Sequence, residues 1–165
     1  MQHIGEPIEP LLRLTLDVAE GLYERGFRRF LCGGATGFDT LAASAVLILK
    51  QRRPDAQLIL VFPCEDQEKS WKPHEQALYR SIREQADRVI VLADHYYNGC
   101  MMTRNRFMVD HAAFCVAYWK DTSTGGTIST IRLALRRGLP VLNIAVPEET
   151  RLFLRDTDLL RPLPF

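Results

Sequence analysis

Two glycine-rich turns are the residues whose types and spacing best fit a binding chemistry. The first, GGATGFD, contains Gly33, Gly34 and Gly37, followed by Asp39. Glycine lets a backbone amide approach a phosphate and permits positive φ, and a helix starting after such a turn offers N–H groups to an anion. Asp39 would cap this helix or accept a ligand hydroxyl. A tight turn that packs a helix on a strand explains the motif equally well. It is not a Walker A loop, because no Gly-Lys-Ser/Thr follows.

A second turn of this kind, DTSTGGT, ends in Gly125, Gly126 and Thr127. Its hydroxyls and glycines suit a phosphate or a sugar, and two such turns at one sheet edge are harder to explain by packing than one. Arg104 and Asn105 lie in the first turns of a predicted helix. A cation there opposes the helix dipole, which favours an anion-binding role for Arg104.

The acidic pair Glu65 and Asp66 follows a buried apolar run. These carboxylates would bind hydroxyls, or act as acid or base if desolvated. Trp71 would either stack on a base or hold this loop down, and the second interpretation is preferred. The His, Cys and Asp residues between 94 and 111 fit no metal-ligand spacing, so no metal is expected. No cofactor is predicted either. The four cysteines form no CxxC pair and are expected to be reduced.

Helical and strand patterns alternate along the whole chain. The pattern predicts helices over 8–22, 40–51, 73–86, 103–113 and 127–137, and strands over 29–32, 57–62, 88–93, 114–119 and 141–146. The strands are near-continuous apolar runs, which is typical of a parallel sheet covered on both faces. We therefore expect a Rossmann-like three-layer α/β fold with a mostly parallel sheet. Its ligand would bind beyond the carboxyl ends of the strands, where the candidate residues lie.

Composition sets further bounds. The 165 residues are 47% hydrophobic and 25% charged, with a net charge of +1, and they contain no repeat. This predicts a single domain over 1–165, with an N-terminal helix in 1–27, a core in 28–146 and a tail in 147–165 that would add a short helix. The near-neutral charge disfavours nucleic acid as a partner. No apolar run is long enough for a bilayer and no signal peptide is recognised, so a cytoplasmic protein without a membrane partner is expected.

With these motifs in view, the chain resembles the SLOG superfamily, in particular its YpsA-like branch of small bacterial proteins. The strings that carry the resemblance occur in the family's order: FLCGGATGFDTLAA, LILVFPCEDQEKSW, YYNGCMMTRNRFMVDH and GGTISTIRLALRRGLPVLNI. The resemblance implies a Rossmann-like fold and a nucleotide or nucleotide-derived ligand. It points to these site residues: Gly33, Gly34, Gly37, Asp39, Glu65, Asp66, Arg104, Asn105, Gly125, Gly126 and Thr127.

Two features depart from this family. Members usually begin with a strand that ends in a Thr-Gly-His-Arg-type motif, whereas this chain begins MQHIGEPIEP and enters its first helix. That strand would lie centrally in the sheet. Its place would be filled by the tail, by a partner chain in a homo-oligomer, or by rearranged strand pairing. Alternatively, the chain is a shortened form of the family, and its ligand binding would then be impaired. The second departure is that the glutamate of the related LOG phosphoribohydrolases, which follows their Gly-Gly-x-Gly-Thr motif, has no counterpart after Thr127.

The leading hypothesis is a protein that binds a small nucleotide-like ligand, with a sensor role. One alternative is a LOG-like hydrolase that cleaves a nucleotide N-glycosidic bond, using Glu65, Asp66 and Arg104. A second alternative is single-stranded DNA binding, as in the related DprA proteins. The sequence names neither the ligand nor a reaction, so catalysis is left open.

Overall fold

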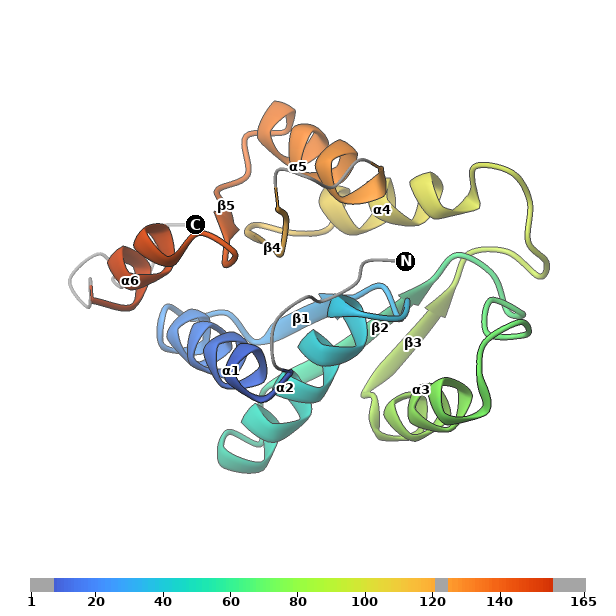
Figure 1. Cartoon of the computed structure of the whole chain (residues 1–165), viewed down its shortest axis with the longest axis horizontal. Coiled ribbons are helices and arrows are strands. Elements are labelled where there is room, and N and C mark those ends of the chain that lie inside the picture. The colour runs from blue at the N-terminus through green and yellow to red at the C-terminus, as the bar shows by residue number, and fades with distance from the viewer. Residues whose placement is uncertain (1–7, 121–124, 156–165) are drawn as a thin grey trace.

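Helices and strands alternate through the computed structural model, which describes residues 8–120 and 125–155. Their order agrees with the predicted one (Figure 1). The elements are α1 (Ile8–Glu24), β1 (Arg29–Cys32), α2 (Phe38–Arg52), β2 (Gln57–Phe62), α3 (Pro73–Gln85), β3 (Arg88–Val91), α4 (Cys100–Asp110), β4 (Cys115–Ala117), α5 (Gly126–Arg136), β5 (Val141–Asn143) and α6 (Pro147–Arg155).

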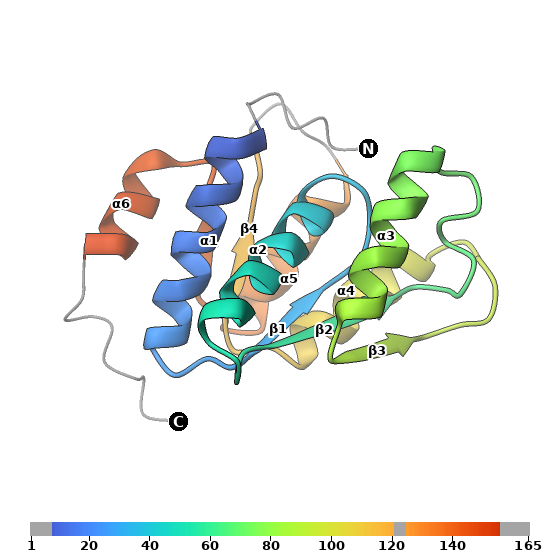
Figure 2. The ribbon, with the colours of Figure 1, turned by 90° about the horizontal axis from the view of Figure 1, so that it is seen from below.

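The strands lie between two layers of helices, so the fold is the predicted Rossmann-like three-layer α/β arrangement. Helices α1, α2 and α3 cover one side of the strands, and α4 and α5 cover the other (Figure 1). Seen from below, α1, α2 and α3 run side by side across their face (Figure 2). The tail adds α6, which packs against α1 and β5.

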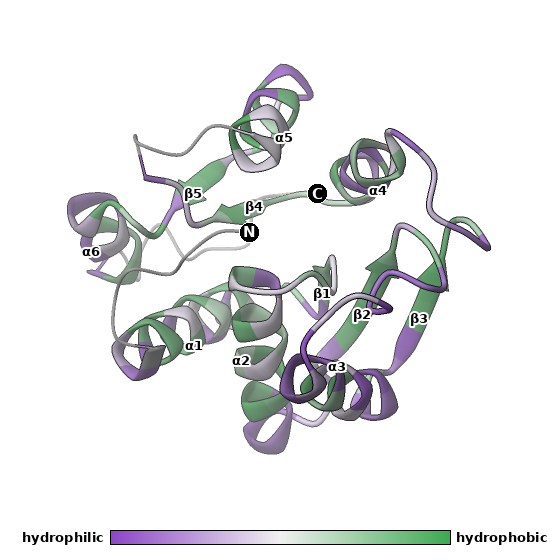
Figure 3. Cartoon of the chain, turned by 45° about the vertical axis from the view of Figure 1, so that its right-hand side comes forward, coloured by the Kyte–Doolittle hydropathy of each residue, from purple (hydrophilic) through white to green (hydrophobic). Residues whose placement is uncertain are grey.

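The parallel strands are divided between two sheets. One sheet has the order β1-β2-β3 and the other pairs β4 with β5. In space the strands follow one another as β5, β4, β1, β2 and β3, and the division falls between β4 and β1 (Figure 3). Among the described residues, no backbone hydrogen bond joins β1 to β4. The division therefore lies in the middle of the strand series, where a central strand was expected to be missing.

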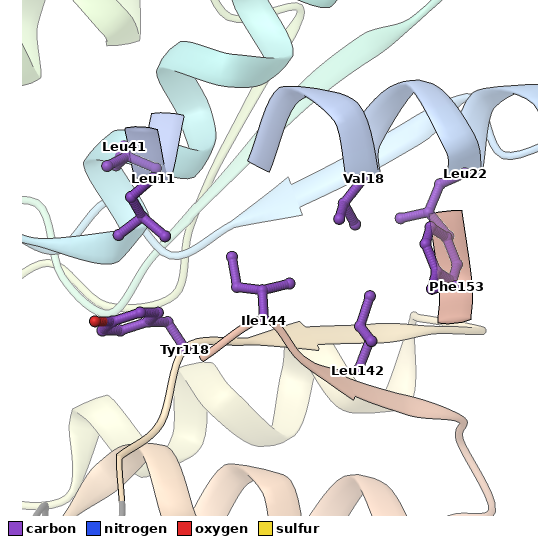
Figure 4. Close-up of a cluster of buried hydrophobic side chains, with 8 residues drawn as sticks. All are labelled: Leu11, Val18, Leu22, Leu41, Tyr118, Leu142, Ile144 and Phe153. Atoms are coloured by element: carbon purple, nitrogen blue, oxygen red, sulfur yellow. The ribbon is translucent and has the colours of Figure 1, made fainter. Parts of the chain in front are cut away.

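A hydrophobic cluster holds the two sheets together across this division. Val18 and Leu22 of α1 lie on the side of Leu142 of β5 and Phe153 of α6, and Leu11 lies at the other end of the cluster (Figure 4). The remaining buried members are Leu41, Tyr118 and Ile144. Because α1 also packs along α2, this helix contacts both halves of the molecule.

Strands β4 and β5 are shorter than the apolar runs that predicted them. At the ends of these strands, the side-chain amide of Asn143 takes the place of the next backbone hydrogen bonds between β4 and β5. Its Nδ2 donates to the Trp119 carbonyl (2.8 Å), and its Oδ1 accepts from the Trp119 N–H (3.0 Å) and the Ala145 N–H (3.2 Å). The side chain thereby satisfies backbone groups that further pairing would otherwise use.

Candidate functional site

The first glycine turn leads from β1 into α2 at the carboxyl end of the sheet. Gly34 and Gly37 have φ values of 71° and 85°, a region that favours glycine. Helix α2 begins after Gly37, which is its N-cap, so the prediction that Asp39 caps the helix is wrong. Asp39 lies in the first helical turn, and its Oδ2 accepts the Ala35 N–H at 3.3 Å. The positive φ of Gly37 starts the helix earlier than the apolar pattern indicated.

Close approach of protein groups requires glycine at two positions of this turn. A Cβ on residue 33 would lie 2.2 Å from Nη1 of Arg104, and one on residue 34 would lie 2.3 Å from the Phe62 ring. Tight packing, one of the two explanations left open by the sequence, therefore applies to Gly33 and Gly34. The packing partner of Gly33, however, is a cation.

Arg104 of α4 places a buried positive charge against the first turn. The residue is 5% exposed. Its Nη1 donates to the Gly33 carbonyl at 2.5 Å, its Nε donates to Oδ1 of Asn105 at 2.7 Å, and Nη1 lies 3.8 Å from Oδ2 of Asp39. Within the described chain its Nη2 donates no hydrogen bond. Nη2 is therefore the donor of this guanidinium whose bonding the described residues do not account for.

The second glycine turn lies on the other side of Asn105. The Nδ2 atom of Asn105 is 3.9 Å from the position that a Cβ on Gly126 would take. Gly125 has a φ of 124° and is the N-cap of α5. The turn's first residues, 121–124, lie outside the described residues. The structure thus brings together the two turns that the sequence singled out, with the side chains of Arg104 and Asn105 between them.

The N-cap residues of the helices that follow the two turns are both glycines. Neither Gly37 before α2 nor Gly125 before α5 carries a side chain that could accept a first-turn N–H. The N-terminal N–H groups of an α-helix have no partner inside the helix, and they carry the positive end of its dipole. Both helix starts therefore suit an anion placed between the turns.

The acidic pair Glu65 and Asp66 contacts residues outside the two glycine turns. Glu65 Oε1 binds Nη2 of Arg83 at 2.8 Å, and Asp66 accepts the Tyr96 N–H at 3.2 Å. A hydrogen bond from the Cys64 thiol is the main cause that lowers the pKa of Asp66, which is therefore charged at neutral pH. Among the described residues, neither carboxylate bonds to Arg104 or to a glycine turn. The geometry therefore does not give these two candidates a shared site with Arg104.

Gln67 lies beside the first glycine turn, a position that sequence reasoning missed. Its Nε2 is buried, and it lies 3.2 Å from the position of a Cβ on Gly34. A glutamine in a polar loop gives no recognisable signal in the sequence. Trp71 packs edge-on against Tyr79 with ring centroids 5.2 Å apart, which agrees with a role in holding the loop down.

Other groups in the described ranges do not form a further centre. No three His, Cys, Asp or Glu side chains come together there as metal ligands. The four cysteines are free thiols, and burial is the main cause that raises the pKa of Cys64 to about 11. None of the helices in the described parts is long and apolar enough to cross a bilayer.

Comparison with known proteins identifies the family. A model described as the YspA SLOG family matches residues 11–137. The prophage-derived protein YoqJ of Bacillus subtilis is 30% identical over 134 residues, which cover 74% of this chain and 78% of YoqJ. A UPF0398 protein of Halalkalibacterium halodurans is 29% identical over 118 residues, covering 70% of this chain and 62% of that protein. The UPF0398 protein YpsA of Bacillus subtilis is 28% identical over 89 residues, covering 53% and 49%.

The alignments span less than two thirds of the two UPF0398 proteins, so their whole length is not represented here. The family match, in contrast, covers both glycine turns, the acidic loop and α4. The chain belongs to the YpsA-like branch of the SLOG family.

Proposed function

We propose that this protein binds a small, phosphate-bearing, nucleotide-derived ligand in the cytoplasm, at the place where the two glycine turns meet Arg104. One observation carries the proposal: a guanidinium that is 5% exposed lies between both turns and keeps its Nη2 without a hydrogen bond to any described residue. Taking an arginine out of water is costly, so a buried one is typically paired or has a use.

The pairing within the described chain leaves the guanidinium of Arg104 only partly bonded. Asp39 is the carboxylate nearest to the guanidinium, at 3.8 Å, which is too long for a good hydrogen bond. Arginine binds phosphate through parallel N–H donors. The starts of α2 and α5, whose N-cap residues are glycines, would add backbone N–H groups to the same anion. Asp39 would then accept a ribose hydroxyl, as acidic residues do in dinucleotide-binding folds.

The arrangement supports binding, and a sensor role, more than hydrolysis. An N-glycosidic hydrolase needs a carboxylate that stabilises cationic character at the sugar or activates water. Glu65 is held by Arg83, and Asp66 is held by the loop after β3. We therefore assign no catalytic role to Glu65, Asp66 or Arg104.

Isothermal titration with AMP, ADP-ribose, NAD and inorganic phosphate tests the proposal. Arg104→Lys keeps the charge but loses the planar fork, so we expect the affinity for the bound nucleotide to fall at least tenfold. Arg106→Lys is the matched control, because Arg106 is an exposed arginine on the same helix, and it should bind as the unchanged protein does.

Asn105→Asp is a second variant, which still tests the proposal if Arg104→Lys does not fold. An aspartate still accepts the hydrogen bond from Arg104 Nε, but it places a negative charge between the turns and should weaken phosphate binding. Circular dichroism checks that each variant is folded. The proposal fails if the folded, unchanged protein binds none of the four compounds, or if both Arg104→Lys and Asn105→Asp bind normally.

A further inference from the structure

Exposed aromatic side chains are concentrated in one short stretch. Of the six large hydrophobic side chains that are exposed in the described chain, Tyr96, Tyr97 and Met101 lie within six residues, between β3 and the first turn of α4. Tyr96 is 66% exposed and Tyr97 is 45% exposed. This loop extends beyond the carboxyl ends of β2 and β3 (Figure 1). Exposed aromatics that cluster in this way are typical of binding surfaces.

The two tyrosines are held in place although their rings face solvent. The Tyr96 N–H donates to Oδ1 of Asp66 at 3.2 Å, and the Tyr97 hydroxyl donates to Oγ1 of Thr103 at 3.2 Å. The Thr103 hydroxyl in turn donates to the Gly99 carbonyl at 3.3 Å. A ring that is anchored in advance loses less conformational entropy when a partner binds.

Each anchoring residue is next in sequence to a residue that lies against the first glycine turn. Asp66, which holds Tyr96, is followed by Gln67, whose Nε2 lies against Gly34. Thr103, which holds Tyr97, is followed by Arg104, whose Nη1 binds the Gly33 carbonyl. The residues that anchor the two tyrosines are therefore sequence neighbours of the two side chains, Gln67 and Arg104, that lie against the turn.

We infer that Tyr96 and Tyr97 form a stacking platform for the nucleobase of the ligand. The inference rests on the proposed function, since it takes the phosphate to lie at Arg104, and it narrows the ligand class to nucleotides rather than sugar phosphates. Aromatic rings can stack on any nucleobase, because every base has a π-face. Aromatic rings suit the base, as the buried guanidinium suits the phosphate. Trp71 is excluded from this role by its packing against Tyr79.

Titration of two probes that differ by the base tests the platform. AMP carries the base, and ribose 5-phosphate is the same sugar phosphate without it. We expect Tyr96→Ala and Tyr97→Ala each to weaken AMP binding about tenfold and to leave ribose 5-phosphate binding unchanged. Tyr97→Phe keeps the ring and should retain most of the AMP affinity. Leu152→Ala, which removes a side chain that is 66% exposed on α6, is the control and should bind both probes normally.

The outcomes separate this inference from the proposed function. If the unchanged protein binds AMP and ribose 5-phosphate equally well, or if the tyrosine variants bind AMP normally, the platform is overturned and phosphate binding stands. If the folded protein binds neither probe, nor ADP-ribose, NAD or inorganic phosphate, the proposed function falls with the platform. If the variants lose both probes equally, the loop positions the phosphate site and does not stack on a base. Sedimentation that shows self-association abolished by Tyr96→Ala would instead assign the tyrosines to an interface between copies.

Discussion

Gly33, Arg104 and Asp39 have to be considered as one unit at the scale of residues. The absence of a Cβ on Gly33 gives Arg104 its place, and the Gly33 carbonyl accepts from the guanidinium. Asp39 supplies the nearby negative charge and closes the turn by accepting the Ala35 N–H. A change at any one of these residues therefore disturbs the other two.

Substitution of Gly33 by alanine should destabilise the protein, whereas the same substitution at Gly126 should not. In Gly33→Ala the new Cβ would lie 2.2 Å from Nη1 of Arg104, so the buried cation must give up its hydrogen bond. We expect the free energy of unfolding to fall by about 2 kcal/mol, the typical contribution of a charged hydrogen bond. Urea denaturation measures this change.

Gly126→Ala is the matched control. Gly126 begins α5 without a positive φ, and the nearest atom to its new Cβ would be 3.9 Å away. Alanine is favoured over glycine in helices, so this variant should be as stable as the unchanged protein or more so. Equal losses in the two variants would contradict the packing described for Gly33.

Asp87 joins three elements at the amino ends of the strands. Its carboxylate accepts the Leu58 N–H at the start of β2 (2.8 Å) and forms an ion pair with Lys50 near the end of α2. Asp87 itself lies one residue before β3, and its backbone N–H donates to the Leu58 carbonyl at 2.9 Å. Burial raises the pKa of Asp87, but the hydrogen bonds with Lys50 and Leu58 outweigh it and hold the pKa below its usual value.

This depressed pKa predicts an acid-sensitive contribution to stability. The native state binds the Asp87 proton less readily than the unfolded state, so the contribution is present above the ordinary aspartate pKa of about 3.9 and is lost as the pH falls through the lower native value. In Asp87→Asn we expect a loss of about 1 kcal/mol at pH 7, because an amide accepts more weakly than a carboxylate, and a shallower decline below pH 4.

Urea unfolding at a series of pH values between 2 and 7 measures this dependence. Asp17→Asn, which removes an exposed carboxylate on α1, should leave the acid limb as steep as before. If Asp87→Asn declines as steeply as the unchanged protein, another group carries the acid sensitivity.

At the scale of the whole molecule, α1 is the element that makes two sheets into one folded unit. The sheet order gives no pairing between β1 and β4 in the described chain, so side-chain packing must hold the halves together. The cluster around Leu22 and Leu142 provides this packing, with residues from α1, β5 and α6. A hydrophobic cluster that spans both halves predicts cooperative unfolding.

The two tryptophans report on the two halves separately. Trp71 packs with the cluster of the three-stranded half, and Trp119 follows β4 in the other half. We expect the variants Trp71→Phe and Trp119→Phe to show coincident urea transitions by fluorescence of the tryptophan that remains. Two separate midpoints would mean that the halves unfold independently.

Leu142→Ala should shift both transitions together. Leu142 is 5% exposed, and truncation of a buried leucine typically costs about 2–5 kcal/mol. The control Leu152→Ala, at a largely exposed position, should stay within about 0.5 kcal/mol of the unchanged protein. A shift of the Trp119 signal alone would show that the cluster does not couple the halves.

The sequence by itself determined the elements and the type of fold. The run QLILVF predicted β2 with both ends correct, because a strand buried on both faces is a continuous apolar segment whose limits are set by polar residues and Pro63. Helix starts were less accurate: α4 begins three residues before its predicted start, because the left-handed Gly99 rather than the apolar pattern sets its first turn. The glycine turns were also found from sequence, since few residues tolerate their backbone conformations.

Only the tertiary structure decided what lies beside those turns. No local pattern shows that Arg104, 71 positions after Gly33, would donate to its carbonyl, or that Gln67 would face Gly34 while Glu65 and Asp66 turn away. The ends of β4 and β5 likewise depend on the bonds that Asn143 makes with Trp119, 24 positions earlier. Periodicity and turn chemistry act over a few neighbouring residues, whereas contacts between distant segments are fixed by the packing of the whole chain.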